Sequence, residues 1–163
     1  MDDRGGVEIR TYRPDDAPAL FDIFYSAVHG TAATYYTPAQ IAAWAPAELG
    51  RDAWAAHLDT IAPFVAQIDG RAVGYADLQS DGYIDHFFVH GDFARRGIGN
   101  TLMHTLHQTA RERALDRLYS NVSLAAVAFF DVWGFECVQA QTPIRRGVAI
   151  DNVRMRKRLG RTG

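Results

Sequence analysis

The feature that most constrains this chain is a glycine-rich turn between an apolar strand and an amphipathic helix. Residues 83–89 are apolar and aromatic except for one Asp-His pair, a pattern that predicts a strand covered on both faces. From residue 101 to residue 115, apolar side chains recur at helical spacing, and polar side chains fill the opposite face. Gly97 and Gly99 open this helix. The stretch therefore predicts a strand, a tight turn and a helix in direct succession.

The turn has the chemistry of a phosphate-binding site. Glycines allow backbone N–H groups to approach a ligand closely, and the first N–H groups of a helix have no partner within the helix. Their aligned dipoles favour an anion, and Arg95 and Arg96 add full positive charge beside them. The stretch lacks both the Gly-Lys-Ser/Thr ending of a nucleotide P-loop and the Gly-x-Gly-x-x-Gly spacing of a dinucleotide fold. We expect a diphosphate here, although a Gly-x-Gly also begins many helices that bind no phosphate.

Two motifs resemble those of the GNAT superfamily of acetyl-CoA-dependent N-acetyltransferases. Residues 87–89, Phe-Phe-Val, match the end of the family's central strand, and residues 94–99 match its Gln/Arg-x-x-Gly-x-Gly/Ala loop. The segment 123–135 is similar to the family's Asn-x-x-Ala-x-x-Phe-Tyr-x-x-x-Gly-Phe pattern. The sequence departs from these patterns at three positions. Ala94 stands where the family usually has Gln or Arg, Ser123 where it has Asn, and Phe130 where it has Tyr.

This resemblance implies an enzyme that binds acetyl-CoA as a cosubstrate and moves its acetyl group to a primary amine of a small molecule or a peptide by direct attack. It implies no metal. An alternative is a GNAT-like module that binds or senses CoA without turnover. The residues implied for cofactor binding are Phe87, Phe88, Val89, Arg95, Arg96, Gly97, Ile98, Gly99, Asn100, Ser123, Phe129 and Phe130.

The implied reaction needs a base for the amine and a donor for the developing oxyanion. The resemblance assigns the donor to a backbone N–H at Phe88 or Val89 and the base to the position of Asp85. Period-two alternation places Asp85 on one strand face with Phe87, and His86 on the other. His86 has the more suitable intrinsic pKa but lies on the wrong face. Asp85 could instead cap a turn or pair with an arginine.

The departing thiolate also needs a proton, and Phe130 has none to give where relatives carry a tyrosine. A water or a hydroxyl from elsewhere must then fill this role. Among Ser123, Tyr35 and Tyr36, we favour Tyr36 as a third catalytic candidate, on the expectation that its loop is mobile and closes over the thioester. The surrounding segment 30–44 carries aromatic rings and hydroxyls, and the resemblance implies that it walls the acceptor site.

The whole sequence predicts alternating strands and helices. Expected strands lie at residues 7–12, 64–68, 71–77, 83–89, 117–122, 136–144 and 151–159, and expected helices at 13–28, 37–45, 51–61, 101–115 and 125–133. The order matches a GNAT-like α/β (α+β) fold forming a single domain over residues 1–163. We expect a mixed, mostly antiparallel sheet of about seven strands with helices on both faces, in which strands four and five run parallel.

Composition and charge limit the partners and the compartment that we expect for this protein. With 48% hydrophobic residues the chain can bury a substantial core, and a net charge of −2 gives no general case for nucleic acid as a partner. No apolar run approaches the roughly 18 residues of a membrane span, so we expect no membrane partner. Cys137 is the single cysteine, which fits a reducing compartment, and we expect a cytoplasmic protein. A homodimer is compatible with the sequence.

Overall fold

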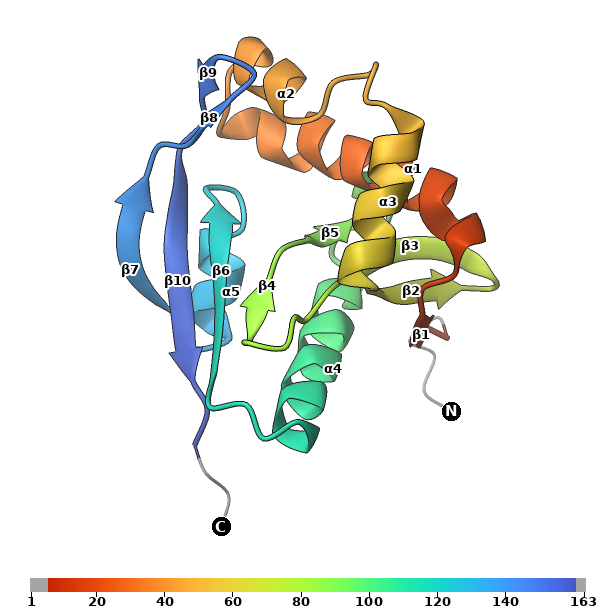
Figure 1. Ribbon diagram of the computed structural model, residues 1–163, viewed down its shortest axis with the longest axis vertical. Helices are drawn as coiled ribbons and strands as arrows, with labels where there is room; N and C mark the ends of the chain where they lie inside the picture. Colours follow the sequence, from red (N-terminus) through yellow and green to blue (C-terminus); the bar gives the residue numbers. More distant parts are fainter. Residues whose placement is uncertain (1–5, 161–163) are drawn as a thin grey trace.

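Two four-stranded sheets and a small hairpin make up the strands of the computed structural model, which describes residues 6–160 (Figure 1). The ends of the predicted domain 1–163 lie outside these residues. The first sheet is antiparallel and has the order β1 (Glu8–Thr11), β2 (Phe64–Ile68), β3 (Arg71–Ala76) and β5 (Phe87–Val89). The second has the order β4 (Tyr83–Ile84), β6 (Arg117–Ser123), β10 (Asn152–Arg158) and β7 (Glu136–Gln141).

The predicted strand 83–89 is interrupted, and its halves belong to different sheets. β4 pairs in parallel with β6, which confirms the predicted parallel pair for this half, whereas β5 pairs antiparallel with β3. At the break, the Asp77 carboxylate accepts hydrogen bonds from the backbone N–H groups of Asp85 (2.9 Å) and His86 (2.7 Å). Because these two donors are taken by a side chain, they cannot continue a strand ladder. The single sheet of about seven strands is therefore split into two.

Helices cover both faces of the first sheet. On one side α1 (Ala17–His29), α2 (Pro38–Trp44) and α3 (Arg51–Ile61) form a core with Val65 and Tyr75. On the other side α4 (Ile98–Glu112) packs against Ala66 and Ala76. The neighbouring residues 65 and 66, and likewise 75 and 76, thus enter different cores, as strand alternation requires.

Several boundaries differ from those predicted, and turn chemistry explains them. α4 begins at Ile98, earlier than residue 101, because Gly97 takes the left-handed conformation just before it. α5 covers only Val127–Val132, and Gly134, with φ of 89°, follows it. Between β7 and β10, where the sequence predicted strands at 136–144 and 151–159, a left-handed Arg146-Gly147 turn joins two further short strands, β8 (Ile144–Arg145) and β9 (Val148–Ala149).

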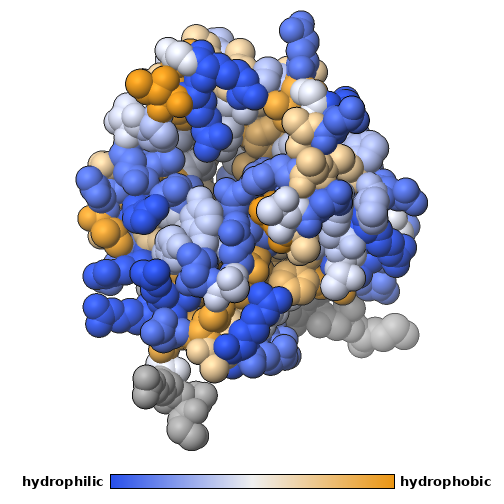
Figure 2. All heavy atoms as spheres, viewed as in Figure 1, coloured by the Kyte–Doolittle hydropathy of each residue, from blue (hydrophilic) through white to orange (hydrophobic). Residues whose placement is uncertain are grey.

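The outer surface is largely polar. Hydrophilic residues cover most of the face seen in Figure 2, and the large hydrophobic side chains exposed in residues 6–160 are dispersed over Tyr35, Val132, Val138 and Ile144. In the described part of the chain, no helix has both the length and the apolar character needed to cross a membrane. Because the described residues form no large hydrophobic patch on this face, the buried polar residues are the features that indicate a functional site.

Candidate active site

The glycine turn borders a cavity of about 370 Å³ at the start of α4. Gly97 has a φ of 78°, and a Cβ added there would meet no heavy atom within 4 Å. The helix ladder begins with the bond from the Thr101 N–H to the Gly97 carbonyl (3.0 Å). The N–H groups of residues 98–100, which line the cavity, therefore lack an intrahelical partner. The cavity has the positive end of a 15-residue helix at its wall, as an anion site requires.

A second cavity of about 240 Å³ lies against the first. Both are lined by Trp44, Phe87, Phe88, Ser123 and Ala126, so the two cavities share a wall where β5 diverges from β6. A ligand that occupies the first cavity and ends at this wall would meet a ligand in the second. This is the arrangement that a two-substrate transfer needs.

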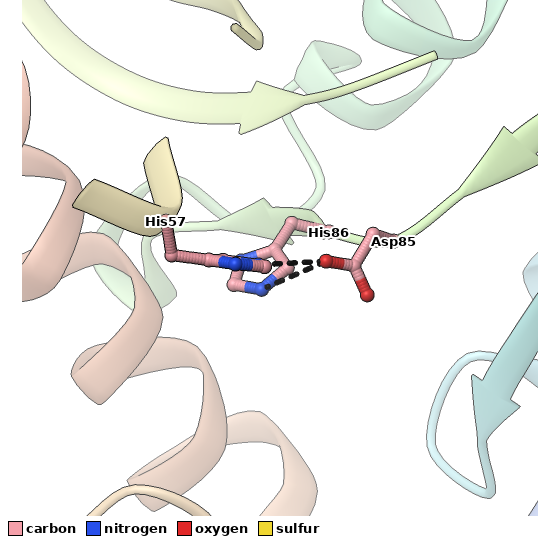
Figure 3. Close-up of side chains that lie close together, drawn as sticks. All are labelled: His57, Asp85 and His86. Atoms are coloured by element: carbon pink, nitrogen blue, oxygen red, sulfur yellow. Dashed lines mark hydrogen bonds and ion pairs between the residues drawn. The ribbon is translucent and has the colours of Figure 1, made fainter. Parts of the chain in front are cut away.

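At the floor of the second cavity, three polar side chains converge (Figure 3). His57 extends from α3, whereas Asp85 and His86 form the link between β4 and β5. The Asp85 Oδ2 atom lies 2.7 Å from His57 Nε2 and 3.7 Å from His86 Nε2. The sequence predicted Asp85 and His86 on opposite strand faces, but both side chains line the second cavity, because the link is not regular strand. The His86 ring packs against Phe24 of α1.

His86 and Asp85 differ in their access to solvent and in their partners. Burial lowers the pKa of His86 to about 4, so its imidazole is neutral at pH 7. The buried Tyr75 hydroxyl lies 3.0 Å from His86 Nδ1, and burial holds the pKa of Tyr75 well above 10. Tyr75 therefore keeps its proton, and its hydroxyl shares a hydrogen bond with the Nδ1 atom of the neutral His86 ring. On the other side of the carboxylate, the Tyr83 hydroxyl lies 3.5 Å from Asp85 Oδ1.

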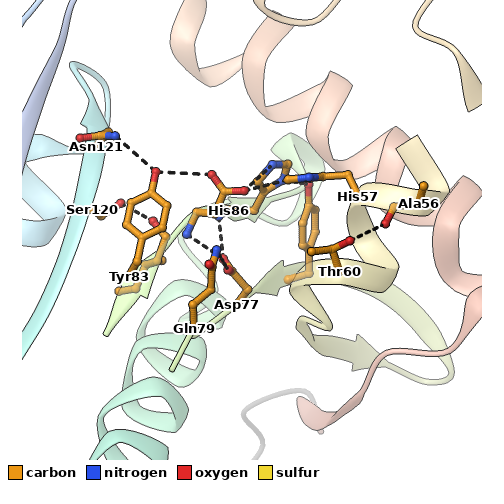
Figure 4. Close-up of polar contacts among 12 residues, drawn as sticks. Ala56, His57, Thr60, Asp77, Gln79, Tyr83, His86, Ser120 and Asn121 are labelled. Atoms are coloured by element: carbon orange, nitrogen blue, oxygen red, sulfur yellow. Dashed lines mark hydrogen bonds and ion pairs between the residues drawn. The ribbon is translucent and has the colours of Figure 1, made fainter. Parts of the chain in front are cut away.

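The fully buried Asp77 carboxylate fixes the backbone that carries Asp85 and His86 (Figure 4). Asp77 Oδ1 accepts the two N–H groups of the link, and Asp77 Oδ2 accepts a bond from Gln79 Nε2 (3.2 Å). Burial raises the pKa of Asp77 to about 6, although these hydrogen bonds act in the opposite direction. Asp77 lines neither of these two cavities, and its hydrogen bonds hold the backbone of Asp85 and His86 in place.

The same cluster has the donor types of a metal site. One ligating atom from each of His57, Asp85 and His86 lies within 4.8 Å of the others. The direct hydrogen bond of 2.7 Å between His57 and Asp85 already satisfies two of these atoms, so a metal would have to displace it. The described arrangement is a hydrogen-bonded pair rather than a coordination shell.

Comparison with known proteins identifies the family. The profile of the acetyltransferase (GNAT) domain matches residues 32–159 of this chain. The chain belongs to the GNAT acetyltransferase family. The uncharacterized N-acetyltransferase YafP of Escherichia coli (strain K12) is 35% identical to this GNAT chain over 150 residues, which span 92% of the chain and 95% of YafP. The protein is accordingly an acyltransferase with a mixed α/β GNAT fold.

Solved structures agree with this assignment. The crystal structure of a GCN5-related N-acetyltransferase from Rhodopseudomonas palustris matches the GNAT chain with a TM-score of 0.89 and 32% identity, covering 93% of this chain and 95% of that one. The acetyltransferase yncA from Salmonella typhimurium, whose structure contains acetyl-CoA, matches with a TM-score of 0.70 and 19% identity over 97% and 96% of the two chains. At that identity the second likeness concerns the fold alone.

The GNAT structure gathers nearly all residues predicted for cofactor binding around the first cavity. The two exceptions are Arg96 and Phe130. The Arg96 guanidinium lies 5.2 Å from the centre of the Phe93 ring, beside a neighbouring depression at the start of α4. Phe130 is 2% exposed and lines the second cavity, where its ring packs against Phe87 at 5.7 Å. Phe130 therefore lies beside the shared wall, on the side of the second cavity.

Tyr36 also lines the second cavity, but not on the mobile loop that we predicted. Its side chain is 7% exposed, and its hydroxyl donates to the Asp151 carbonyl (2.6 Å) and accepts from the Leu124 N–H (2.9 Å). Burial raises the pKa of Tyr36. These bonds tie the segment to the strands behind it, because buried hydroxyls need such partners. A proton transfer from Tyr36 would have to break the bond to Asp151.

Three residues of the site were missed by the sequence analysis. His57 occupies the exposed face of a short helix, where a histidine gives no signal of function. Tyr75 reads as an ordinary strand aromatic. Asp77 did carry a signal, since an aspartate directly after the buried run Val73–Ala76 needs partners inside the protein.

Proposed function

We propose that this GNAT enzyme transfers the acetyl group of acetyl-CoA to a primary amine of a small molecule or peptide by direct attack of the amine. The observation that carries the proposal is the shared wall between the two cavities, with the His57–Asp85 pair beside it. The first cavity fits a CoA diphosphate, because the start of α4 supplies N–H donors there and Arg95 lines the same cavity. When bound, acetyl-CoA supplies the acyl thioester.

The backbone of β5 supplies the oxyanion donor in this proposal. The bonds from His90 N–H to the Val73 carbonyl and from Asp77 N–H to the His86 carbonyl fix the alternation of the ladder between β3 and β5. That alternation turns the Phe88 N–H towards β3 and leaves the N–H groups of Phe87 and Val89 on the free edge. Phe87 adjoins the polar cluster, so we assign its N–H to the acyl oxygen instead of the predicted Phe88 or Val89.

Asp85 takes the amine proton in this proposal, and His57 passes it on. A neutral amine is required for attack, and Asp85 is accessible from the second cavity, with 25% of its side chain exposed. His57 is bonded to Asp85 and has 45% of its side chain exposed, which gives the proton an exit to solvent. His86, with its pKa near 4, is a weak base at neutral pH, and its Nε2 atom lies 3.7 Å from the Asp85 carboxylate.

The test is release of CoA thiol from acetyl-CoA over a panel of amines. We expect thiol release that depends on an amine and is reduced by about 10²–10⁴ in Asp85→Asn, while calorimetry shows unchanged acetyl-CoA binding. An alternative function as a CoA-binding or sensing module predicts binding without amine-dependent thiol release. A crystal soaked with acetyl-CoA would show whether the acyl carbon reaches Phe87 N–H and Asp85.

A further inference from the structure

The hairpin of β8 and β9 lies beside α2 (Figure 1), and its residue Arg145 lines the second cavity. Arg146 donates to the Ala43 carbonyl at the end of α2 (2.7 Å), and Gln40 of α2 donates to the Ala149 carbonyl (3.0 Å). The bond from the Tyr36 hydroxyl to the Asp151 carbonyl holds the strand end that follows. Because three bonds tie this short hairpin to helix and loop, the side chains that it presents to the cavity have a defined place.

One of those side chains is Arg145, which lines the second cavity. Within residues 6–160 its guanidinium has no ion pair, although Arg10 and Arg156 are paired with Asp16 and Glu136. Asp151 lines the same cavity, but its Oδ1 atom accepts a bond from Thr142 (2.9 Å).

Arg145 shares the second cavity with the polar cluster. Asp85 and Arg145 both line it, so the cavity carries a carboxylate and a cation.

The rest of the cavity limits the size and character of its occupant. Its volume of about 240 Å³ is below the range typical of pockets for drug-sized ligands. Phe24, Trp44 and Phe88 line it with aromatic surface. We propose that the acceptor is a small primary amine that also carries an anionic group, a carboxylate or phosphonate, bound by Arg145 while its amine lies against Asp85. This inference rests on the proposed acetyl transfer, and it deepens that proposal by naming the class of acceptor.

Matched acceptors test the inference. We would compare phenylalanine, its aminophosphonate analogue, phenylalanine amide, 2-phenylethylamine and a short peptide with a free N-terminus, together with aliphatic counterparts of each. We expect the best acceptor to carry the anionic group next to the amine. A best acceptor without an anion, including the peptide, would overturn the inference and leave acetyl transfer standing. Acetyl-CoA binding without thiol release for any amine would instead overturn the proposed function and the inference with it.

Variants of Arg145 give a second readout. Because a hydrogen bond to a charged group contributes roughly 1.5–3 kcal/mol, Arg145→Gln should raise KM for the anionic acceptor about 10- to 100-fold. The kcat value and the KM for the matched neutral amine should change little, and Arg145→Lys should recover part of the loss. Arg158→Gln, the same charge change at an exposed position of β10, is the control and should leave both KM values unchanged. Equal effects of Arg145→Gln on neutral and anionic acceptors would contradict the assignment.

Discussion

Asp77→Asn separates the role of the Asp77 carboxylate in the site from its effect on stability. The amide has nearly the same shape and keeps an acceptor oxygen for the N–H groups of Asp85 and His86, but it carries no charge. Burial raises the pKa of Asp77 from 3.8 to about 6. Ionising Asp77 in the folded protein therefore costs about 3 kcal/mol more than ionising it in the unfolded chain.

The sign of the pH dependence follows from this raised pKa. Between about pH 4 and pH 6 the folded protein retains the Asp77 proton, whereas the unfolded chain has lost it. The stabilising contribution is complete below pH 4, and it is lost as the pH rises through 6. The Asn variant lacks this contribution. The free energy of unfolding of Asp77→Asn, minus that of the parent, should therefore rise by about 3 kcal/mol from pH 4 to pH 7.

Urea unfolding followed by circular dichroism at pH 4, 5, 6 and 7 measures this difference. Asp22→Asn, at an exposed position of α1, is the matched control, and its difference from the parent should stay flat. We also expect Asp77→Asn to lower kcat/KM, because one amide oxygen holds two N–H groups less firmly than a carboxylate does. A difference that stays flat, or that falls as the pH rises, would refute the reasoning about Asp77.

Four further outcomes are expected. Gly99→Val should weaken CoA binding tens- to thousands-fold in calorimetry, because a Cβ at this position would meet the Phe129 ring at 3.3 Å and push a side chain against the lining of the first cavity; unchanged affinity in a folded variant would contradict the assignment of this cavity to CoA. Asp85→Asn should also remove the acidic limb of the pH profile of kcat/KM, and a larger loss in His86→Ala would transfer the role of base to His86. The free energy of unfolding of His86→Gln, minus that of the parent, should fall by about 3 kcal/mol as the pH rises from 4 to 6.5, since burial depresses the pKa of His86; a flat difference in urea unfolding would contradict this assignment. Phe130→Tyr should leave kcat within roughly tenfold, because a thiol with a pKa of about 8.5 leaves readily, and a hundredfold gain would show that no substitute acid exists.

Local signals predicted most of the fold. The strands predicted at 64–68 and 71–77 and the glycine turn before α4 each depend on residues close together in the sequence, and all of them are confirmed. The interruption of the central strand could not be read in this way. It depends on hydrogen bonds from residues 85 and 86 to a side chain eight and nine positions earlier, after the chain has turned back on itself.

The candidate site was predictable where a motif carried it and not where side chains from distant segments meet. The predicted cofactor residues gather because the loop and helix that hold them are continuous in sequence. His57 and Asp85 are 28 positions apart in the sequence, and no local pattern predicts that they pair. Tyr36 was expected on a loop that closes over the thioester, whereas its hydroxyl donates to the Asp151 carbonyl and accepts from the Leu124 N–H, both far away in the sequence.

The Asp77 carboxylate accepts a hydrogen bond from the backbone N–H of His86. Titration of the Asp77 carboxyl and titration of the His86 imidazole affect stability in opposite directions. The raised pKa of Asp77 lowers the free energy of unfolding as the pH rises from about 4 to 6, and the lowered pKa of His86 raises it over nearly the same range. Each effect amounts to about 3 kcal/mol, so they nearly cancel in the parent. A flat stability profile of the parent would therefore not show that the cluster lacks perturbed groups. Only the variants separate the two effects: between pH 4 and 6 the profile of Asp77→Asn should rise with pH, and that of His86→Gln should fall.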